Sequence, residues 1–217
     1  MIPRSARDKL EPDGYTSRML GPISDKARDL IFKFEDLDQP GEWPGGESGV
    51  TIGIGYDLGF ATPEQFKADW SDCLSTEDCD TLGGVLGLTG QKAKARAAAL
   101  KAIQIRRADA EKVFMQRSVP AAQKQTEAAF PGVDKLPPDA QGALVSLIYN
   151  RGPRMTDRDP SLQDRREMRA IRDAVVKGDL KEIAAQLRSM KRLWEGKGMG
   201  GLLKRRDAEA DLVESCV

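Results

Sequence analysis

The sequence predicts an α+β fold, in which a small β-hairpin lobe and a larger, mainly helical lobe enclose a cleft. Three observations support this prediction. Residues 51–56 alternate β-branched residues with glycine, as a strand or one arm of a hairpin does. A bend rich in proline and glycine, residues 40–49, separates this run from the helix before it. Helical patterns then fill most of the chain from residue 62 to residue 213.

The expected helices begin and end at recognisable signals. Ser24 is a suitable N-cap for a helix that reaches Phe34, and Thr62 before Pro63 starts a helix towards Leu74. Residues 140–149 form the most apolar helix and are expected to lie at the centre of the core. Further helices are expected at 76–82, 90–103, 107–116, 165–176, 179–193 and 202–213, with Pro120 kinking or restarting the chain.

The domain organisation is simple. Residues 1–22 mix proline, glycine and charges without periodicity and are interpreted as an N-terminal arm or linker, so that residues 23–217 form one domain. The 34 basic and 34 acidic residues cancel, which argues against nucleic acid or an anionic membrane as a partner. The N-terminus lacks the apolar stretch of a signal peptide, so we expect synthesis in the cytoplasm.

The chain contains no histidine, which restricts its chemistry more than any other count. Ser-His-Asp and Cys-His catalysis, HExxH zinc sites and His-ligated metals are all excluded. Three cysteines form no CxxC pair, so no zinc site is expected. Cys73 and Cys79 could close a short loop in an oxidising compartment, although free thiols are the simpler interpretation. Proton transfer near neutral pH therefore falls most simply to a carboxyl group, and no cofactor is expected.

Glu35 is the first candidate carboxyl. It lies at the end of the expected helix 24–34, where the negative end of the helix dipole favours the protonated form that a general acid needs. Asp57 follows the glycine-punctuated run, whose bare face would let a ligand approach the backbone. A carboxyl at a helix end that faces another on a hairpin suits glycoside hydrolysis. The simpler alternatives are a solvated Glu35 and an Asp57 that caps the turn at Gly59.

Four blocks in order carry a resemblance to a known family. They are Phe34-Glu35, Thr51–Gly55, Ala143–Asn150 with Gly152, and Trp194 followed by Gly201-Leu202, Arg205-Arg206 and Glu209. Between residues 24 and 214 the chain resembles the phage-type lysozymes, the endolysin muramidases of glycoside hydrolase family twenty-four. The resemblance implies cleavage of the β-1,4 bond between N-acetylmuramic acid and N-acetylglucosamine in peptidoglycan, without a metal or organic cofactor, and with inversion.

The resemblance also implies roles for single residues. Glu35 and Thr51 match the family's glutamate and threonine, but Gly45 stands where its second carboxylate is usual. Asp57, six positions after Thr51, is similar in placement to the aspartate in the lysozyme domain of the bacteriocin pesticin, and Glu47 is the other candidate. Substrate contacts are expected from Tyr56, Tyr149, Asn150 and Arg205, and either Arg205 or Arg206 is a candidate partner for Glu35.

Two other functions remain open at this point. A lytic transglycosylase needs one catalytic glutamate, and a non-catalytic glycan-binding protein needs none. The second alternative stays open because Gly45 stands where the family's second carboxylate is usual. The expected partner is a peptidoglycan glycan strand, without nucleic acid or membrane. A monomer is expected, an immunity or inhibitor protein is left open as a partner, and the site of action would be the periplasm or the cell wall.

Overall fold

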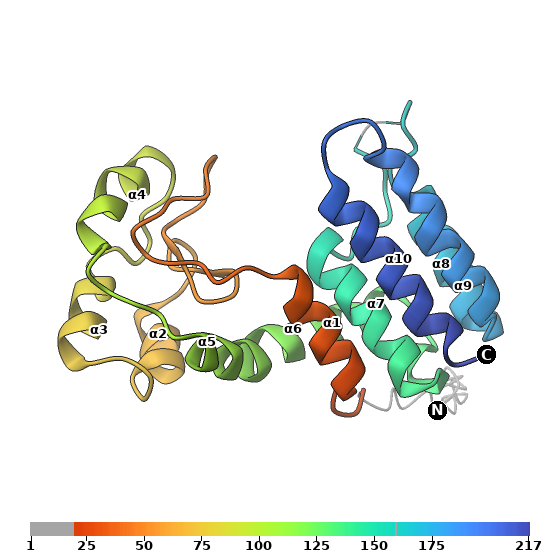
Figure 1. The fold of residues 1–217 in the computed structure, drawn as a ribbon, viewed down its shortest axis with the longest axis horizontal. Coiled ribbons are helices and arrows are strands. Elements are labelled where there is room, and N and C mark those ends of the chain that lie inside the picture. The colour runs from red at the N-terminus through yellow and green to blue at the C-terminus, as the bar shows by residue number, and fades with distance from the viewer. Residues whose placement is uncertain (1–19, 159) are drawn as a thin grey trace, which may run out of the picture.

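The protein is mostly helical, with one small antiparallel sheet, which confirms the α+β prediction at that level. The computed structural model describes residues 20–158 and 160–217, so the predicted arm 1–22 lies largely outside the described residues. Figure 1 places the hairpin, α2 (Pro63–Trp70), α3 (Thr76–Gly83) and α4 (Gly90–Ala97) at one end. The other end is a bundle of α1 (Asp25–Phe34), α7 (Pro138–Arg151), α8 (Arg166–Lys177), α9 (Leu180–Ser189) and α10 (Gly200–Glu214).

Between the two ends runs a long helical segment with an irregular centre (Figure 1). It consists of α5 (Arg107–Val113), a π-helical turn η2 (Phe114–Ser118) and α6 (Val119–Ala129). Pro120 has no N–H to donate to the fourth carbonyl before it, and the wider turn comes directly before this residue. The N–H of Val119 donates to the carbonyl of Phe114, five residues back. The restart predicted at Pro120 therefore takes the form of a π turn.

The hairpin differs from the sequence prediction. β1 (Thr51–Ile52) pairs with β2 (Tyr56–Asp57), so the predicted single arm contains both strands and their turn. Gly53 and Gly55 have φ of 65° and 66°, values in the left-handed region that suit glycine. A Cβ added at Gly53 would meet the ring of Trp70 at 2.8 Å, and one at Gly55 would meet the hydroxyl of Tyr149 at 2.6 Å. Trp70 and Tyr149 therefore cover the side of the chain that was predicted to be bare at these glycines, while Gly55 also lines a neighbouring cavity.

The predicted helix starts hold well. Ser24 Oγ accepts a hydrogen bond from the N–H of Ala27 at the start of α1, and Thr62 forms a capping box with Gln65 at the start of α2. The expected helix 90–103 is shorter, because α4 ends at Ala97 and a 3₁₀ turn η1 (Ala98–Leu100) follows. Two further 3₁₀ turns are η3 (Val133–Lys135) and η4 (Met190–Leu193).

The predicted core helix is central to the bundle. α7 packs against α1, α6 and α10, and its residues from 142 to 148 are all buried. α8 and α9 pack on each other, and α9 packs on α10. Through these contacts, the end of α1, the end of α7 and the middle of α10 converge. In the part of the chain that the structure describes, no helix combines the length and apolar composition needed to cross a membrane.

Candidate functional site

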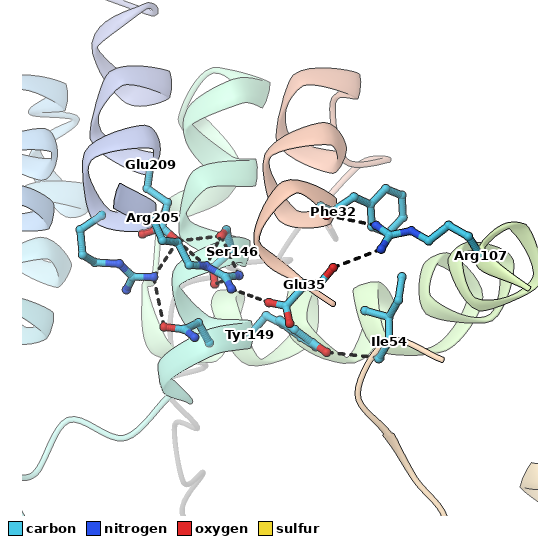
Figure 2. A network of polar contacts seen from close by, with 10 residues as sticks. Phe32, Glu35, Ile54, Arg107, Ser146, Tyr149, Arg205 and Glu209 are labelled. Carbon is cyan, nitrogen blue, oxygen red and sulfur yellow. Dashed lines mark hydrogen bonds and ion pairs between the residues drawn. The ribbon is translucent and has the colours of Figure 1, made fainter. Parts of the chain in front are cut away.

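Glu35 lies where α1 ends. Its backbone is extended, with φ −110° and ψ 124°, so the helix stops at this residue. The guanidinium of Arg107, on α5, donates to the carbonyls of Phe32 at 3.0 Å and Glu35 at 3.2 Å, and so caps the end of α1 (Figure 2). The Glu35 side chain keeps 20% of its surface exposed, and its Oε1 accepts a hydrogen bond from Nη1 of Arg205. Glu35 thus has a partly exposed carboxyl group that is bound by the buried guanidinium of Arg205.

Arg205 anchors Glu35 to the interior of the bundle. It is 2% exposed and donates through Nη2 to Ser146 Oγ on α7 at 3.1 Å. The hydroxyl of Ser146 donates to Oε1 of Glu209 at 2.6 Å, and Arg206 donates to the same oxygen at 2.8 Å. Burial raises the pKa of Glu209, while the charges of Arg206 and Arg205 act in the opposite direction. Two guanidiniums and two carboxyl groups form this network.

This pairing bears on two predictions made from the sequence. Arg205, rather than Arg206, is the partner of Glu35. Because Arg205 is buried and its donors face Glu35, Ser146 and Glu209, it positions the Glu35 carboxylate more readily than it contacts a substrate.

Thr51 and Asp57 are directly opposite in the register of the hairpin. Oδ1 of Asp57 accepts hydrogen bonds from the N–H groups of Gly59 at 2.8 Å and Gly49 at 3.0 Å. The carboxylate therefore links the two backbone segments that flank the hairpin. This contact agrees with the simpler alternative from the sequence, in which Asp57 caps the turn at Gly59. Thr51 lines a cavity of about 220 Å³ with Asp36 and other residues of the bend.

Glu47 is exposed and has a different surrounding. A Cβ added at Gly90 would meet Oε2 of Glu47 at 3.3 Å, so this carboxylate lies beside the first residue of α4. Thr89, the N-cap of α4, provides no side-chain hydrogen bond to the helix. A carboxylate at this end of a helix is favoured by the helix dipole. The Glu47 carboxylate therefore lies at the N-terminal end of α4.

Tyr149 connects the end of α7 to the hairpin. Its hydroxyl donates to the carbonyl of Ile54, in the turn between β1 and β2, at 3.4 Å, and Glu35 lies beside it (Figure 2). Burial, with the nearby Glu35 charge, raises the pKa of Tyr149. Its neighbour Asn150 is exposed and accepts a hydrogen bond from Arg206 at 3.3 Å.

Residues 39–199 match the family described as "Domain of unknown function (DUF8812)". The match spans well over half of the chain. The chain belongs to the DUF8812 family. The DUF8812 region contains the hairpin and α7, whereas Glu35 lies before it and Arg205 after it. None of the curated proteins matches the chain significantly.

The DUF8812 region also carries a cavity beside the hairpin that the sequence did not reveal. Its volume is about 240 Å³, and its lining includes Tyr56, Asp57, Phe60, Gln65, Asp69 and Arg117. Tyr56 donates its hydroxyl to Asp69 at 3.0 Å, and Arg117 binds the same carboxylate through Nε and Nη2. Burial, and then Asp69, raise the pKa of Tyr56. Phe60 is 72% exposed, so its aromatic ring is accessible to solvent at the edge of a cavity that polar side chains also line.

No pattern in the sequence indicates this arrangement, because Asp69 and Arg117 are 48 residues apart and belong to no shared motif. Cys73 and Cys79 are both free thiols, and burial raises the pKa of each. Among the residues described, no group of three His, Cys, Asp or Glu side chains is arranged to hold a metal ion.

Proposed function

We propose that this protein is a muramidase that hydrolyses the β-1,4 bond between N-acetylmuramic acid and N-acetylglucosamine in peptidoglycan. The observation that carries the proposal is the position of Glu35. It is a partly exposed carboxyl at a helix end, it is fixed by a buried arginine, and it lies beside the tyrosine that contacts the hairpin. Fixing a reacting group in one orientation is a large part of what an active site contributes to rate.

In the proposed reaction, Glu35 is the general acid. Its proton passes to the glycosidic oxygen as the bond from that oxygen to the anomeric carbon breaks. A water held by Thr51 attacks the anomeric carbon from the opposite face and transfers its proton to Asp57. The hairpin register supports this division of work, because Thr51 and Asp57 are paired across the two strands.

A lysozyme-like arrangement is part of the proposal. The hairpin end would form the smaller lobe and the bundle the larger one, with the glycan strand between them. The cavity that Phe60 and Tyr56 line supports it, since an exposed aromatic ring among polar side chains suits one face of a sugar and its hydroxyl groups.

One observation favours a second candidate, a lytic transglycosylase. Asp57 accepts hydrogen bonds from two backbone N–H groups, and a carboxylate committed to the backbone is less free to act as a base. A transglycosylase needs no second carboxylate, because the 6-hydroxyl of the sugar replaces water as the nucleophile. The product would then be an anhydro-sugar.

Analysis of the products from purified peptidoglycan separates these candidates. A muramidase releases fragments with a free reducing N-acetylmuramic acid, which borohydride reduces, whereas a transglycosylase releases anhydro-ends that resist reduction. Glu35→Gln protein is the matched control. Failure of the wild-type protein to release any fragment from purified walls would contradict both activities and favour a glycan-binding protein.

A further inference from the structure

Three arginines, of which Arg165 is buried and Arg151 and Arg154 are partly buried, lie at the end of the bundle where α7 is followed by the loop to α8. Arg151 is the last residue of α7, Arg154 lies in the following loop, and Arg165 immediately precedes α8. Arg165 is 7% exposed, yet its Nε and Nη1 have no hydrogen-bond partner. The Nε atoms of Arg151 and Arg154 are also buried without a partner. Buried polar groups are nearly always paired in folded proteins, so four such atoms in one place need an explanation.

The carboxylate within this group does not satisfy the arginines. Asp164 Oδ1 accepts a hydrogen bond from the N–H of Arg158 at 2.8 Å. Its Oδ2 is 3.5 Å from Nη2 of Arg154 and 3.8 Å from Nε of Arg165, distances that are long for a hydrogen bond.

Other contacts hold the three guanidiniums together. Arg151 donates to the carbonyl of Asp164 at 2.6 Å, and Arg165 donates to the carbonyl of Arg151 at 3.1 Å. Asp157, another carboxylate that the structure describes in this loop, is bound by the guanidinium of Arg169 at 3.1 Å and accepts from the backbone N–H of Arg165 at 2.6 Å. Among the residues that the structure describes, three guanidiniums therefore share a single carboxylate.

The pKa values of Arg151 and Arg165 also indicate that these guanidiniums lack sufficient negative charge nearby. Burial, and then the charges of Arg165 and Arg206, lower the pKa of Arg151 to about 10. Burial and the charge of Arg154 lower the pKa of Arg165 as well. The three guanidiniums outnumber the carboxylate that they share, so the cluster carries an excess of positive charge that is partly shielded from water. Such charges are costly unless a counter-charge accompanies them.

We propose that Arg151, Arg154 and Arg165 form a binding site for an oxyanion, a carboxylate or a phosphate. The planar fork of an arginine matches either group, and several forks around one anion give short, charge-assisted hydrogen bonds. Arg165 forms the buried wall of the site. The side chain of Arg154 keeps 34% of its surface exposed and leaves the site open to solvent.

The cluster is continuous with the Glu35 network. The guanidinium of Arg151 lies 4.8 Å from the ring centre of Trp194, and that of Arg206 lies 6.0 Å from the same ring. Arg206 in turn binds Glu209, which contacts Arg205. Resting on the proposed function, the source of the anion is a carboxylate of the peptide attached to the glycan strand.

The first experiment measures the anion site without using activity. Thermal unfolding of the full chain is followed as inorganic phosphate replaces chloride at constant ionic strength. We expect a saturable rise in Tm of about 4–8 °C at a phosphate concentration about thirty times Kd. Arg154→Gln, at a half-exposed position where folding is little affected, should lose most of this rise. Arg172→Gln, at an exposed position on α8, is the matched control and should keep it.

Equal responses in Arg154→Gln and Arg172→Gln, or a wild-type response to phosphate no larger than to chloride, would overturn the site. Arg165→Gln provides a second variant at the buried wall. If it folds, its Tm should no longer respond to phosphate. A phosphate response that survives in both Arg154→Gln and Arg165→Gln would also overturn the site.

The second experiment identifies the source of the anion. Soluble peptidoglycan fragments with intact peptide carboxylates are compared with the same fragments after amidation of those carboxylates, using Glu35→Gln protein so that nothing is cleaved. Intact fragments should bind at least about tenfold more tightly, and adding Arg154→Gln should abolish the difference. Equal binding of both fragments would exclude the wall peptide as the source. The phosphate titration still decides the site if the protein does not cleave walls.

Discussion

Arg205 joins Glu35 to Glu209, two carboxylates that come from helices at opposite ends of the sequence. Glu35 is the partly exposed member and Glu209 is fully buried, so the guanidinium between them spans from the surface to the core. A charge in this position holds the Glu35 side chain in one orientation. It also makes the geometry of Glu35 depend on the packing of α10 against α7.

Replacing Arg205 should therefore separate positioning from stability. Arg205→Lys keeps the charge but loses the fork that reaches Glu35, Ser146 and Glu209 together, so we expect a fall in kcat of about 10- to 100-fold with a smaller change in KM. Arg205→Met leaves Glu209 and Glu35 without this partner and should cost about 3–5 kcal/mol of stability. Initial rates of wall lysis and urea unfolding measure the two effects. Arg96→Lys, at an exposed position, is the control; a wild-type rate in Arg205→Lys would contradict the positioning role.

Glu35→Gln should abolish lysis without unfolding the protein. The amide keeps the size of the side chain and can still accept from Arg205, but it has no proton to give to the glycosidic oxygen. Turbidity loss of purified walls measures the rate, and circular dichroism checks the fold. Glu195→Gln, an exposed carboxyl near η4, should lyse at the wild-type rate. A folded Glu35→Gln protein with normal activity would remove Glu35 from the mechanism.

Asp57 and Glu47 can be told apart in the same assay. We expect Asp57→Asn to lose at least about two orders of magnitude in rate, the contribution of a general base. Asparagine Oδ1 can still accept from the N–H groups of Gly49 and Gly59, so the loop should survive. Glu47→Gln should lose much less, because Glu47 is exposed beside α4. A dead Glu47→Gln together with an active Asp57→Asn would reverse the assignment. If Asp57→Asn and Glu47→Gln are both active and the released glycan fragments carry anhydro-ends, the protein is a lytic transglycosylase.

Glu167 gives the protein an acid-sensitive element. Its side chain is fully buried; burial alone would raise its pKa, but the hydrogen bonds and charge of Arg192, with Arg166, lower it below the ordinary value of 4.5. A lowered pKa in the folded state means that the contribution to stability is complete above about pH 4.5 and is lost as pH falls through the lowered pKa. Tm should therefore fall on acidification, and Glu167→Gln should weaken that dependence while costing about 1.5–3 kcal/mol at neutral pH. An unchanged acid slope in Glu167→Gln would show that other carboxyls carry it.

Gly53 and Gly87 form a matched pair for testing the hairpin turn. Both have positive φ, 65° and 74°, but a Cβ at Gly53 would meet Trp70 at 2.8 Å, whereas a Cβ at Gly87 would meet no atom within 4 Å. Gly87→Ala should cost about 1–2 kcal/mol from backbone strain alone. Gly53→Ala should cost about 1–3 kcal/mol more, because the ring of Trp70 must move. Urea denaturation gives both values, and equal costs would contradict the packing of Trp70 on the turn.

Local signals explain what could be predicted from the sequence. The caps at Ser24 and Thr62 and the apolar spacing in α7 depend on residues a few positions apart, and the structure agrees with them. The hairpin was misread because β-branched residues alternating with glycine fit a strand, while positive φ at Gly53 is a property of the backbone that composition does not display.

Contacts between distant segments explain what was missed. Asp69 with Arg117 and the cluster around Arg165 bring together charges that are ordinary surface residues when each is considered alone. For Glu35 the sequence analysis left Arg205 and Arg206 as alternative partners, and the structure selects Arg205, since spacing along the chain holds no information about a contact 170 residues apart.

The π turn before Pro120 has a consequence for how the two ends of the molecule are coupled. One additional residue in a helical turn advances the angular phase of everything beyond it by about 100°. Phe114, at the start of that turn, packs its ring against Phe32 and Tyr149, while Arg117, three residues on, reaches Asp69 beside the hairpin. The wider turn thus lets one continuous helix present an apolar contact to the bundle and an ionic contact to the hairpin end. Removing a single residue there would rotate α5 relative to α6. Either the contact of Phe114 with the bundle or that of Arg117 with Asp69 would then be lost.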